Sequence, residues 1–222
     1  MRWRRRRMKN ILVMVILFVF LFGCTGIPVR KALQEDISIP SGKIEGNQFT
    51  GIRYPFNVSV PPPWKLSTEF PDFLVDLGYD RPFSTDKEQT ELYAYHPETK
   101  SNINFDFTPA GQYARFSQEK IEGLTSMGTE SLMAELDKEF GRGVVKPDVH
   151  PTEPISLKGV QYAAKKYATY TAKGIKREQG WIYGFTEPYQ IFILYLIFDK
   201  EGTNDRQDLK KILDSFEVMT KK

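Results

Sequence analysis

The stretch 181-WIYGFTEPYQIFILYLIFDK-200 decides the fold class of this chain. Its first residues alternate between aromatic and other side chains, which is the period of a strand with one apolar face. The aromatic ones are Trp181, Tyr183 and Phe185. A Glu-Pro pair then marks a turn, and residues 189–198 are almost continuously apolar and rich in Ile, Phe and Tyr. A strand of that composition is covered on both faces of its sheet. The stretch therefore predicts a hairpin in a sheet that has helices on both sides.

Other alternating segments predict further strands. The segment 49-FTGIRYPFNVSVPPPW-64 reads as one or two short strands interrupted at Pro55, and its run of three prolines ends the pairing because proline cannot donate to a ladder. The runs TELYAYHP (90–97) and SNINFDFTP (101–109) are joined by a short polar turn and predict a hairpin. The run 159-GVQYAAKKYATYTAKG-174 leads into the hairpin of residues 181–198.

Two segments have the period of a helix. Residues 113–140 fit either one bent helix or two consecutive helices, since Gly123 and Gly128 each lower helix stability by about 1 kcal/mol relative to Ala. The apolar positions are Phe116, Ile121, Leu124, Met127, Leu132, Leu136 and Phe140, and Gly141 suits a left-handed cap. In the second segment, 204–219, one helix face carries Leu209, Ile212, Leu213 and Phe216, with Thr203 or Asn204 as N-cap. The order of elements predicts an α+β domain, an α/β/α sandwich around a central, mainly antiparallel sheet.

The sequence resembles the PsbP/Mog1-like group, whose members share an α/β/α sandwich on an antiparallel sheet. The matching segments cover nearly all of residues 50–218; they are YPFNVSVPPPW (54–64), INFDFTP (103–109) with the helix after it, GVQYAAKKYATY (159–170), the hairpin 181–198 and ILDSFEV (212–218). Members commonly open the domain with a strand, a proline and a tryptophan, and close it with a helix ending in Ser-Phe. The triple proline and the glycines of the middle helix depart from that pattern. Known members mostly act as accessory or binding subunits, so the resemblance implies binding.

The amino-terminal residues follow the order of a secretory signal. The cationic start MRWRRRRMK precedes an unbroken apolar run at 11–22, and a small residue closes the segment. The tetrad Leu21-Phe22-Gly23-Cys24 resembles the lipobox of bacterial lipoproteins, in which a diacylglyceryl group is attached to the cysteine sulfur and the signal is cut just before that cysteine. The resemblance implies lipidation of Cys24 and cleavage between Gly23 and Cys24. Phe22 departs from the small residues that are usual at its position.

Two other interpretations of this segment stay open. Extended to Ile27, the apolar run comes close to the lower limit of about 17 to 25 residues for a spanning helix, so the segment would also fit an uncleaved signal-anchor. The third interpretation is an ordinary buried thiol, although Cys24 lies outside the segments that have a folding pattern. Cys24 is the only cysteine and therefore cannot form a disulfide within the chain.

Three regions follow from this reading: a signal peptide at 1–23, the lipidated cysteine and a flexible tether at 24–48, and one globular domain at 49–222. The formal net charge of the chain is +3, but six of its 31 basic residues lie in the signal and leave 25 against 28 acidic residues. The basic clusters at 165–166 and 173–177 read as solvated strand and turn positions. Without a concentrated basic face, we expect no nucleic-acid binding.

No set of residues predicts catalysis. Ser117 and Lys120 match the Ser-x-x-Lys pattern of penicillin-interacting enzymes, but the Ser-Asp-Asn and Lys-Thr-Gly elements that complete such a site are absent from the sequence. Ser117 reads instead as the start of a helix. The two histidines, His96 and His150, each precede a proline and read as turn residues at strand ends, and no spacing directs metal ligands to one point. We therefore expect no enzyme activity, no cofactor and no metal.

The lipobox, the tether and the missing catalytic set predict a membrane-anchored envelope lipoprotein. Its domain is expected to act as a non-catalytic protein-binding or assembly-accessory module with an envelope protein as partner. Acylated Cys24 would insert into the lipid bilayer of the cell membrane or outer membrane, with the domain facing the periplasm or the exterior. The alternative is a small-molecule or lipid-binding envelope protein with a cleft between sheet and helix.

Overall fold

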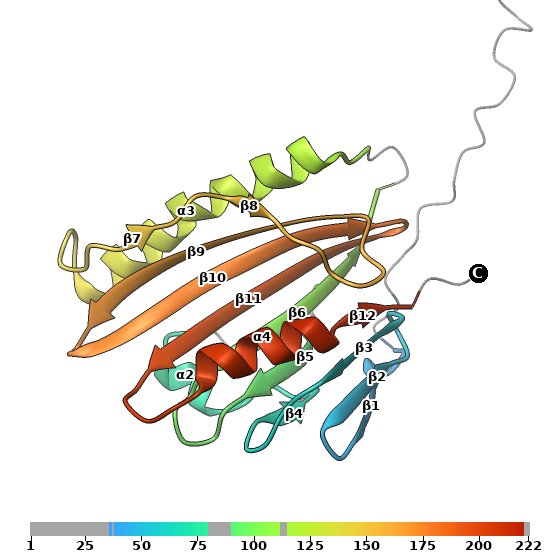
Figure 1. The fold of residues 1–222 in the computed structure, drawn as a ribbon, viewed down its shortest axis with the longest axis horizontal. Coiled ribbons are helices and arrows are strands. Elements are labelled where there is room, and N and C mark those ends of the chain that lie inside the picture. Colours follow the sequence, from blue (N-terminus) through green and yellow to red (C-terminus); the bar gives the residue numbers. More distant parts are fainter. Residues whose placement is uncertain (1–35, 37, 80–89, 112–114, 220–222) are drawn as a thin grey trace, which may run out of the picture. The chain divides into compact units, whose positions relative to one another are not determined.

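The computed structural model of the chain describes residues 36, 38–79, 90–111 and 115–219. The predicted signal peptide, with Gly23 and Cys24, and most of the predicted tether lie outside the described residues. Within those ranges the chain forms two antiparallel sheets and three helices (Figure 1). The expected α+β class is confirmed.

The larger sheet contains the predicted hairpins. Its strand order is β4-β5-β6-β11-β10-β9-β7, and β8 also pairs with β9. The bounds are β4 Lys65–Ser67, β5 Thr90–Tyr95, β6 Asn102–Pro109, β7 Asp148–Val149, β8 Glu153–Pro154, β9 Tyr162–Ala172, β10 Ile175–Thr186 and β11 Tyr189–Asp199. Strands β10 and β11 pair without interruption from Lys176 and Asp199 to Thr186 and Tyr189. The stretch that decides the fold class therefore lies at the middle of the sheet, as its composition predicted.

The smaller sheet has the order β1-β2-β3-β12. Its strands are β1 Gly42–Glu45, β2 Gln48–Gly51, β3 Phe56–Ser59 and β12 Glu217–Val218. Strand β1 lies within the range expected to be a tether and pairs with β2 along its whole length, so regular structure begins before residue 49. The last predicted helix is shorter than expected. It ends at Ser215, and Phe216 has an extended backbone that leads into β12.

The helices α3 (Gln118–Phe140) and α4 (Asp205–Ser215) cover opposite faces of the larger sheet (Figure 1). Residues paired across the strands share a face, and successive pairs alternate between the two faces. The row of Ile182, Ile193 and Phe105 belongs to the core under α4 and the smaller sheet. The next row contains Trp181, which belongs to the core under α3. A sheet buried on both faces explains why β11 is apolar at nearly every position.

The core under α4 is aromatic. Phe56, Phe105 and Phe216 are all fully buried, and the rings of Phe105 and Phe216 stack with centroids 5.7 Å apart. Ile212 of α4 is also fully buried in this cluster. Phe216 therefore anchors the end of α4 although it is no longer part of the helix.

The middle helix is a single element that starts later than predicted, and the predicted apolar stripe is buried at Ile121, Leu132 and Leu136 but not at the positions between them. Its buried residues are Ile121, Thr125, Leu132 and Leu136. Leu124 and Met127, which the sequence placed on the apolar stripe, are 37 % and 68 % exposed. Gly141 has a positive φ of 95° as its C-cap, but its ψ of 146° is not that of a left-handed cap. Among the described residues, no helix is both long and apolar enough to cross a membrane.

Candidate ligand-binding cleft

Helix α3 forms one wall of a cleft on the sheet. Its first turn is capped by Ser117, whose Oγ accepts a hydrogen bond of 3.3 Å from the main-chain N–H of Lys120. The helix is then fixed to β10 through Trp181, whose Nε1 donates to the main-chain oxygen of Thr125 at 2.7 Å. Gly128 faces the same indole without a side chain, so the helix and the strand approach each other closely at this point.

The second wall is the segment that follows the short helix α2 (Phe73–Asp76). Leu74 of α2 is fully buried, and its main-chain oxygen accepts a hydrogen bond of 3.0 Å from the N–H of Tyr79. The ring of Phe73 lies 5.3 Å from the ring of Tyr95 on β5, measured between centroids. These contacts hold the segment 77–79 over the same face of the sheet as α3.

Between the two walls lies a cleft of about 400 Å³. Helix α3 contributes Glu135, Leu136, Lys138 and Glu139. The floor is formed by Tyr170 of β9, Arg177 and Gln179 of β10, and Leu194 and Leu196 of β11. The volume lies in the range of about 300 to 1,000 Å³ that is usual for small-molecule sites, which are mostly apolar with a few placed polar groups.

The polar groups of the floor form a hydrogen-bonded chain. The phenol of Tyr170 donates to Oε1 of Gln179 at 2.9 Å, and Nε2 of Gln179 donates to Oε2 of Glu135 at 3.2 Å. The chain runs from β9 across β10 to α3. It fixes the amide of Gln179 in one orientation and leaves Glu139 as the second carboxylate of the cleft.

Arg177 differs from the other charged residues of the cleft because it is buried. Only 7 % of it is exposed, and its guanidinium lies between two rings, 5.4 Å from the centroid of Phe140 and 5.0 Å from that of Phe198. In the part of the chain that the structure describes, its Nε has no hydrogen-bond acceptor and its guanidinium has no carboxylate within ion-pair distance, although it interacts with the phenol of Tyr170. A buried cation without a counter-ion is costly, so this side chain marks the cleft as a place where charge is left uncompensated.

The tyrosines of the cleft stay protonated. Burial raises the pKa of Tyr170 to about 12, although the charge of Arg177 acts in the opposite direction. Burial also raises the pKa of Tyr79, and the negative charge of Glu135 adds to that shift. Near neutral pH both side chains are therefore neutral phenols that can donate hydrogen bonds.

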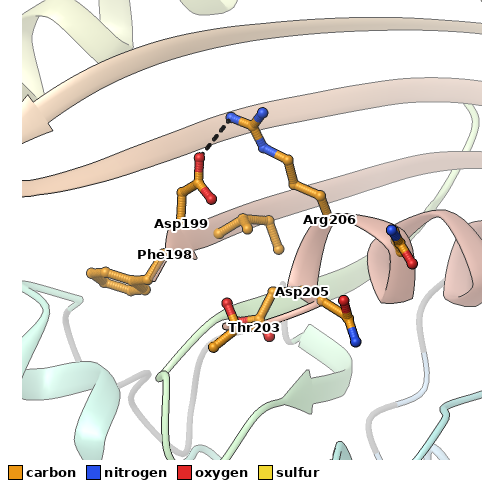
Figure 2. Close-up of a pocket in the computed structure, with 8 residues that line it drawn as sticks. Phe198, Asp199, Thr203, Asp205 and Arg206 are labelled. Carbon is orange, nitrogen blue, oxygen red and sulfur yellow. Dashed lines mark ion pairs between the residues drawn. The ribbon is translucent and has the colours of Figure 1, made fainter. Parts of the chain in front are cut away.

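A second depression, of about 120 Å³, lies beside the start of α4 (Figure 2). Asp205 is buried there, and its Oδ2 accepts hydrogen bonds from Thr99 and Ser101, both at 2.5 Å. Arg206 pairs with Glu178 at 3.1 Å and with Asp199 at 3.7 Å, the pair that Figure 2 marks. These charges are occupied in holding the β5–β6 turn, α4 and the sheet together. We therefore assign the residues of this depression a structural role, which is to hold these elements together.

The histidines lie at strand ends, as predicted. His96 follows β5, and its Nδ1 accepts from the main-chain N–H groups of Glu98 and Thr99, both at 3.2 Å. His150 follows β7 and stacks on Tyr167 with ring centroids 4.1 Å apart. Lys120 donates from Nζ to the main-chain oxygen of Arg115. Across the described ranges, no three His, Cys, Asp or Glu side chains gather as a metal site requires.

The interpretation of residues 173–177 as solvated is wrong for Arg177. Strand β10 begins at Ile175, so the alternation that places Trp181 on the α3 face also places Gln179 and Arg177 there. If the alternation of Trp181, Tyr183 and Phe185 is continued towards the amino terminus by four residues, it identifies Gln179 and Arg177 as residues of this face. The pairing of Gln179 with Glu135 had no signal in the sequence, because the two residues are on different elements.

The comparisons with known proteins concern the fold. No family model and no curated protein matches the chain. Among solved structures it is similar to the cyanobacterial PsbP (CyanoP) of Synechocystis sp. PCC 6803, with 8 % identity, a TM-score of 0.50, and coverage of 81 % of this chain and 99 % of that one. It is also similar to LpqN of Mycobacterium tuberculosis, described as involved in cell envelope biogenesis, with 10 % identity, a TM-score of 0.46, and coverage of 75 % and 84 %. The chain therefore has a PsbP-like fold, as the resemblance implied.

Proposed function

We propose that this protein is a lipid-anchored accessory protein of the cell envelope that acts by binding and not by catalysis. The tetrad Leu21-Phe22-Gly23-Cys24 after a cationic and apolar segment supports the anchor. Two or three acyl chains hold a protein firmly on a bilayer, since each buried CH2 contributes about 0.8 kcal/mol. The observation that supports binding is the cleft between α3 and the sheet, which the described residues line on three sides.

The anchor is tested by labelling cells with palmitate. The wild-type protein is expected to incorporate the label, to begin at Cys24 after processing and to stay with membranes after a carbonate wash. Cys24→Ala is expected to lose the label and the lipoprotein-specific cleavage. Thr25→Ala, the neighbouring substitution, is expected to behave as wild type. Label on Cys24→Ala, or a mature wild-type chain that begins elsewhere, would refute the anchor.

The binding partner in this proposal is a protein of the same envelope. Crosslinking in intact cells followed by affinity recovery compares the wild type with a form in which residues 1–24 are replaced by a cleavable secretory signal without a cysteine, so that the same folded part is exported without an anchor. A protein recovered with the wild type at native abundance and lost with the anchorless form supports the accessory role. Recovery of the same proteins with both forms, or of none, counts against it.

A second candidate function is the binding of a small molecule in the cleft. Arg177 is the observation that favours it, because a protein–protein contact at the rim would not explain a cation buried in the floor. The two candidates are separated by where substitutions act. Substitutions at exposed positions of α3, such as Met127, would weaken the binding of a protein partner. A substitution of Arg177 would weaken the binding of a small ligand.

A further inference from the structure

We propose that the cleft binds a small organic carboxylate with an apolar body, whose carboxylate pairs with Arg177 and whose body lies on Leu194 and Leu196. This inference rests on the second candidate function above and names the class of its ligand. It combines three observations: an uncompensated charge, the chemistry of the floor, and the charges around it.

The uncompensated charge is the guanidinium of Arg177. It is more than nine-tenths buried, it lines the cleft, and its Nε donor is unused within the described residues. The rings of Phe140 and Phe198 attract its positive charge but do not accept its Nε hydrogen. A carboxylate satisfies both needs at once, because it neutralises the charge and accepts hydrogen bonds from the planar N–H groups of arginine.

The floor beside Arg177 is apolar. Leu194 and Leu196, two residues apart on β11, lie on the α3 face of the sheet, and Leu136 of α3 lines the same cleft. An apolar ligand body placed here would remove leucine surface from water, which is favourable in proportion to the area buried. A bare inorganic anion would gain nothing from this surface.

The charges at the walls limit the ligand to one negative charge. Glu135 and Glu139 line the same cleft as Arg177, and only Lys138 adds a positive charge on α3. A doubly charged phosphate would meet two carboxylates for one buried cation. A monocarboxylate carries half that charge, so the two glutamates repel it less and Arg177 alone can pair with it. Gln179 adds no charge to the cleft, and one of the two hydrogens on its Nε2 already donates to Glu135.

The experiment compares two probes of nearly the same size and shape, 3-phenylpropionate and 3-phenylpropanamide, which differ in charge and in one acceptor oxygen that the amide replaces by an NH2 donor. Full-length protein in nanodiscs is dialysed to equilibrium against each probe, with empty nanodiscs as the blank. The carboxylate is expected to bind at least about tenfold more tightly than the amide, since a hydrogen bond to a charged group in a buried site is worth that factor or more. Equal binding of the two probes, or no binding of either, would overturn the inference.

Substitutions test whether Arg177 supplies the positive charge that binds the carboxylate. Arg177→Met removes the charge, keeps an unbranched apolar side chain beside the two rings, and is expected to remove the preference for the carboxylate. Arg206→Met is the matched control, because this arginine is ion-paired on the opposite face of the sheet and its loss is expected to leave the preference unchanged. Leu194→Trp is expected to weaken the binding of both probes, because the larger side chain fills the cleft. A preference that survives in Arg177→Met refutes the inference.

Stability provides an independent readout. Removing a buried, unpaired cation is expected to leave the urea midpoint of Arg177→Met equal to the wild type or higher. A lower midpoint would mean that the guanidinium serves folding, which overturns its assignment to a ligand. The labelling of Cys24 does not depend on these results. Failure of the carboxylate test would leave the lipid anchor standing, and failure of the anchor would leave the cleft chemistry unaffected.

Discussion

Nε1 of Trp181 on β10 donates a 2.7 Å hydrogen bond to the main-chain oxygen of Thr125 on α3. The indole is 3 % exposed, so the bond is made in a buried place where an unpaired N–H would be costly. Because it joins a helix carbonyl to the middle strand of the sheet, it fixes how far α3 lies from β10. That distance in turn sets the width of the neighbouring cleft between Leu136 and the floor.

Gly128 is expected to tolerate no side chain at this contact. A Cβ there would lie 2.5 Å from Nε1 of Trp181, so Gly128→Ala must displace the helix or the indole. We expect a loss of about 1–3 kcal/mol in the free energy of unfolding, typical of overpacking, although Ala is the better helix former. Urea unfolding followed by circular dichroism measures it.

Gly123 in the same helix is the matched control for this prediction. A Cβ there would have no heavy atom within 4 Å, so Gly123→Ala is expected to raise the free energy of unfolding by up to about 1 kcal/mol. Stabilisation by both substitutions would contradict the role assigned to Gly128.

Gly180 makes room for a tyrosine on the other face of β10. Tyr195 is fully buried, its phenol donates to Oε1 of Glu178 at 3.1 Å, and its ring lies where a side chain of residue 180 would project. Gly180→Ala is expected to destabilise the protein by about 1–3 kcal/mol. The double variant with Tyr195→Leu is expected to lose less than the sum of the single losses, because the smaller side chain removes the clash. Additive losses in urea unfolding would argue against this contact.

Arg53 and Glu91 form a buried ion pair between the turn before β3 and strand β5. Nη1 of Arg53 lies 2.8 Å from Oε1 of Glu91, and the two side chains are 7 % and 0 % exposed. Arg53→Met leaves a buried carboxylate without this partner and is expected to cost about 3–5 kcal/mol. Arg53→Met combined with Glu91→Leu is expected to be more stable than Arg53→Met alone. The thermal midpoints of the three proteins test this order.

The raised pKa of Tyr170 predicts a loss of stability in alkali. The folded protein keeps the phenol protonated to about pH 12, whereas the unfolded chain releases the proton near the ordinary value of about 10. The contribution is therefore complete below pH 10, and the free energy of unfolding falls by roughly 1–3 kcal/mol as the pH rises from 10 to 12. Urea midpoints at pH 9.5 and 11.5 measure the fall, and Tyr170→Phe should reduce it. An unchanged pH dependence in Tyr170→Phe would show that other groups cause the loss.

The local pattern of side chains determined the secondary structure and the class of the fold. Alternation at residues 181–185 and the apolar run after it identified a hairpin covered on both faces, because the period of a strand fixes which residues share a side. The spacing of Leu209 and Ile212 identified the closing helix for the same reason. Both signals depend only on neighbours within a few residues of each other.

The face of α3 and the contents of the cleft were decided by the tertiary structure. Gly128 looked like a weakness of the helix until Trp181, which comes from a distant strand, occupied the space beside it. Arg177 looked solvated because it stands near a turn, yet the ring of Phe140 from α3 covers it. The composition of a segment reports what each residue prefers, but which residues meet depends on strand register and helix packing, and those are set by the whole core at once.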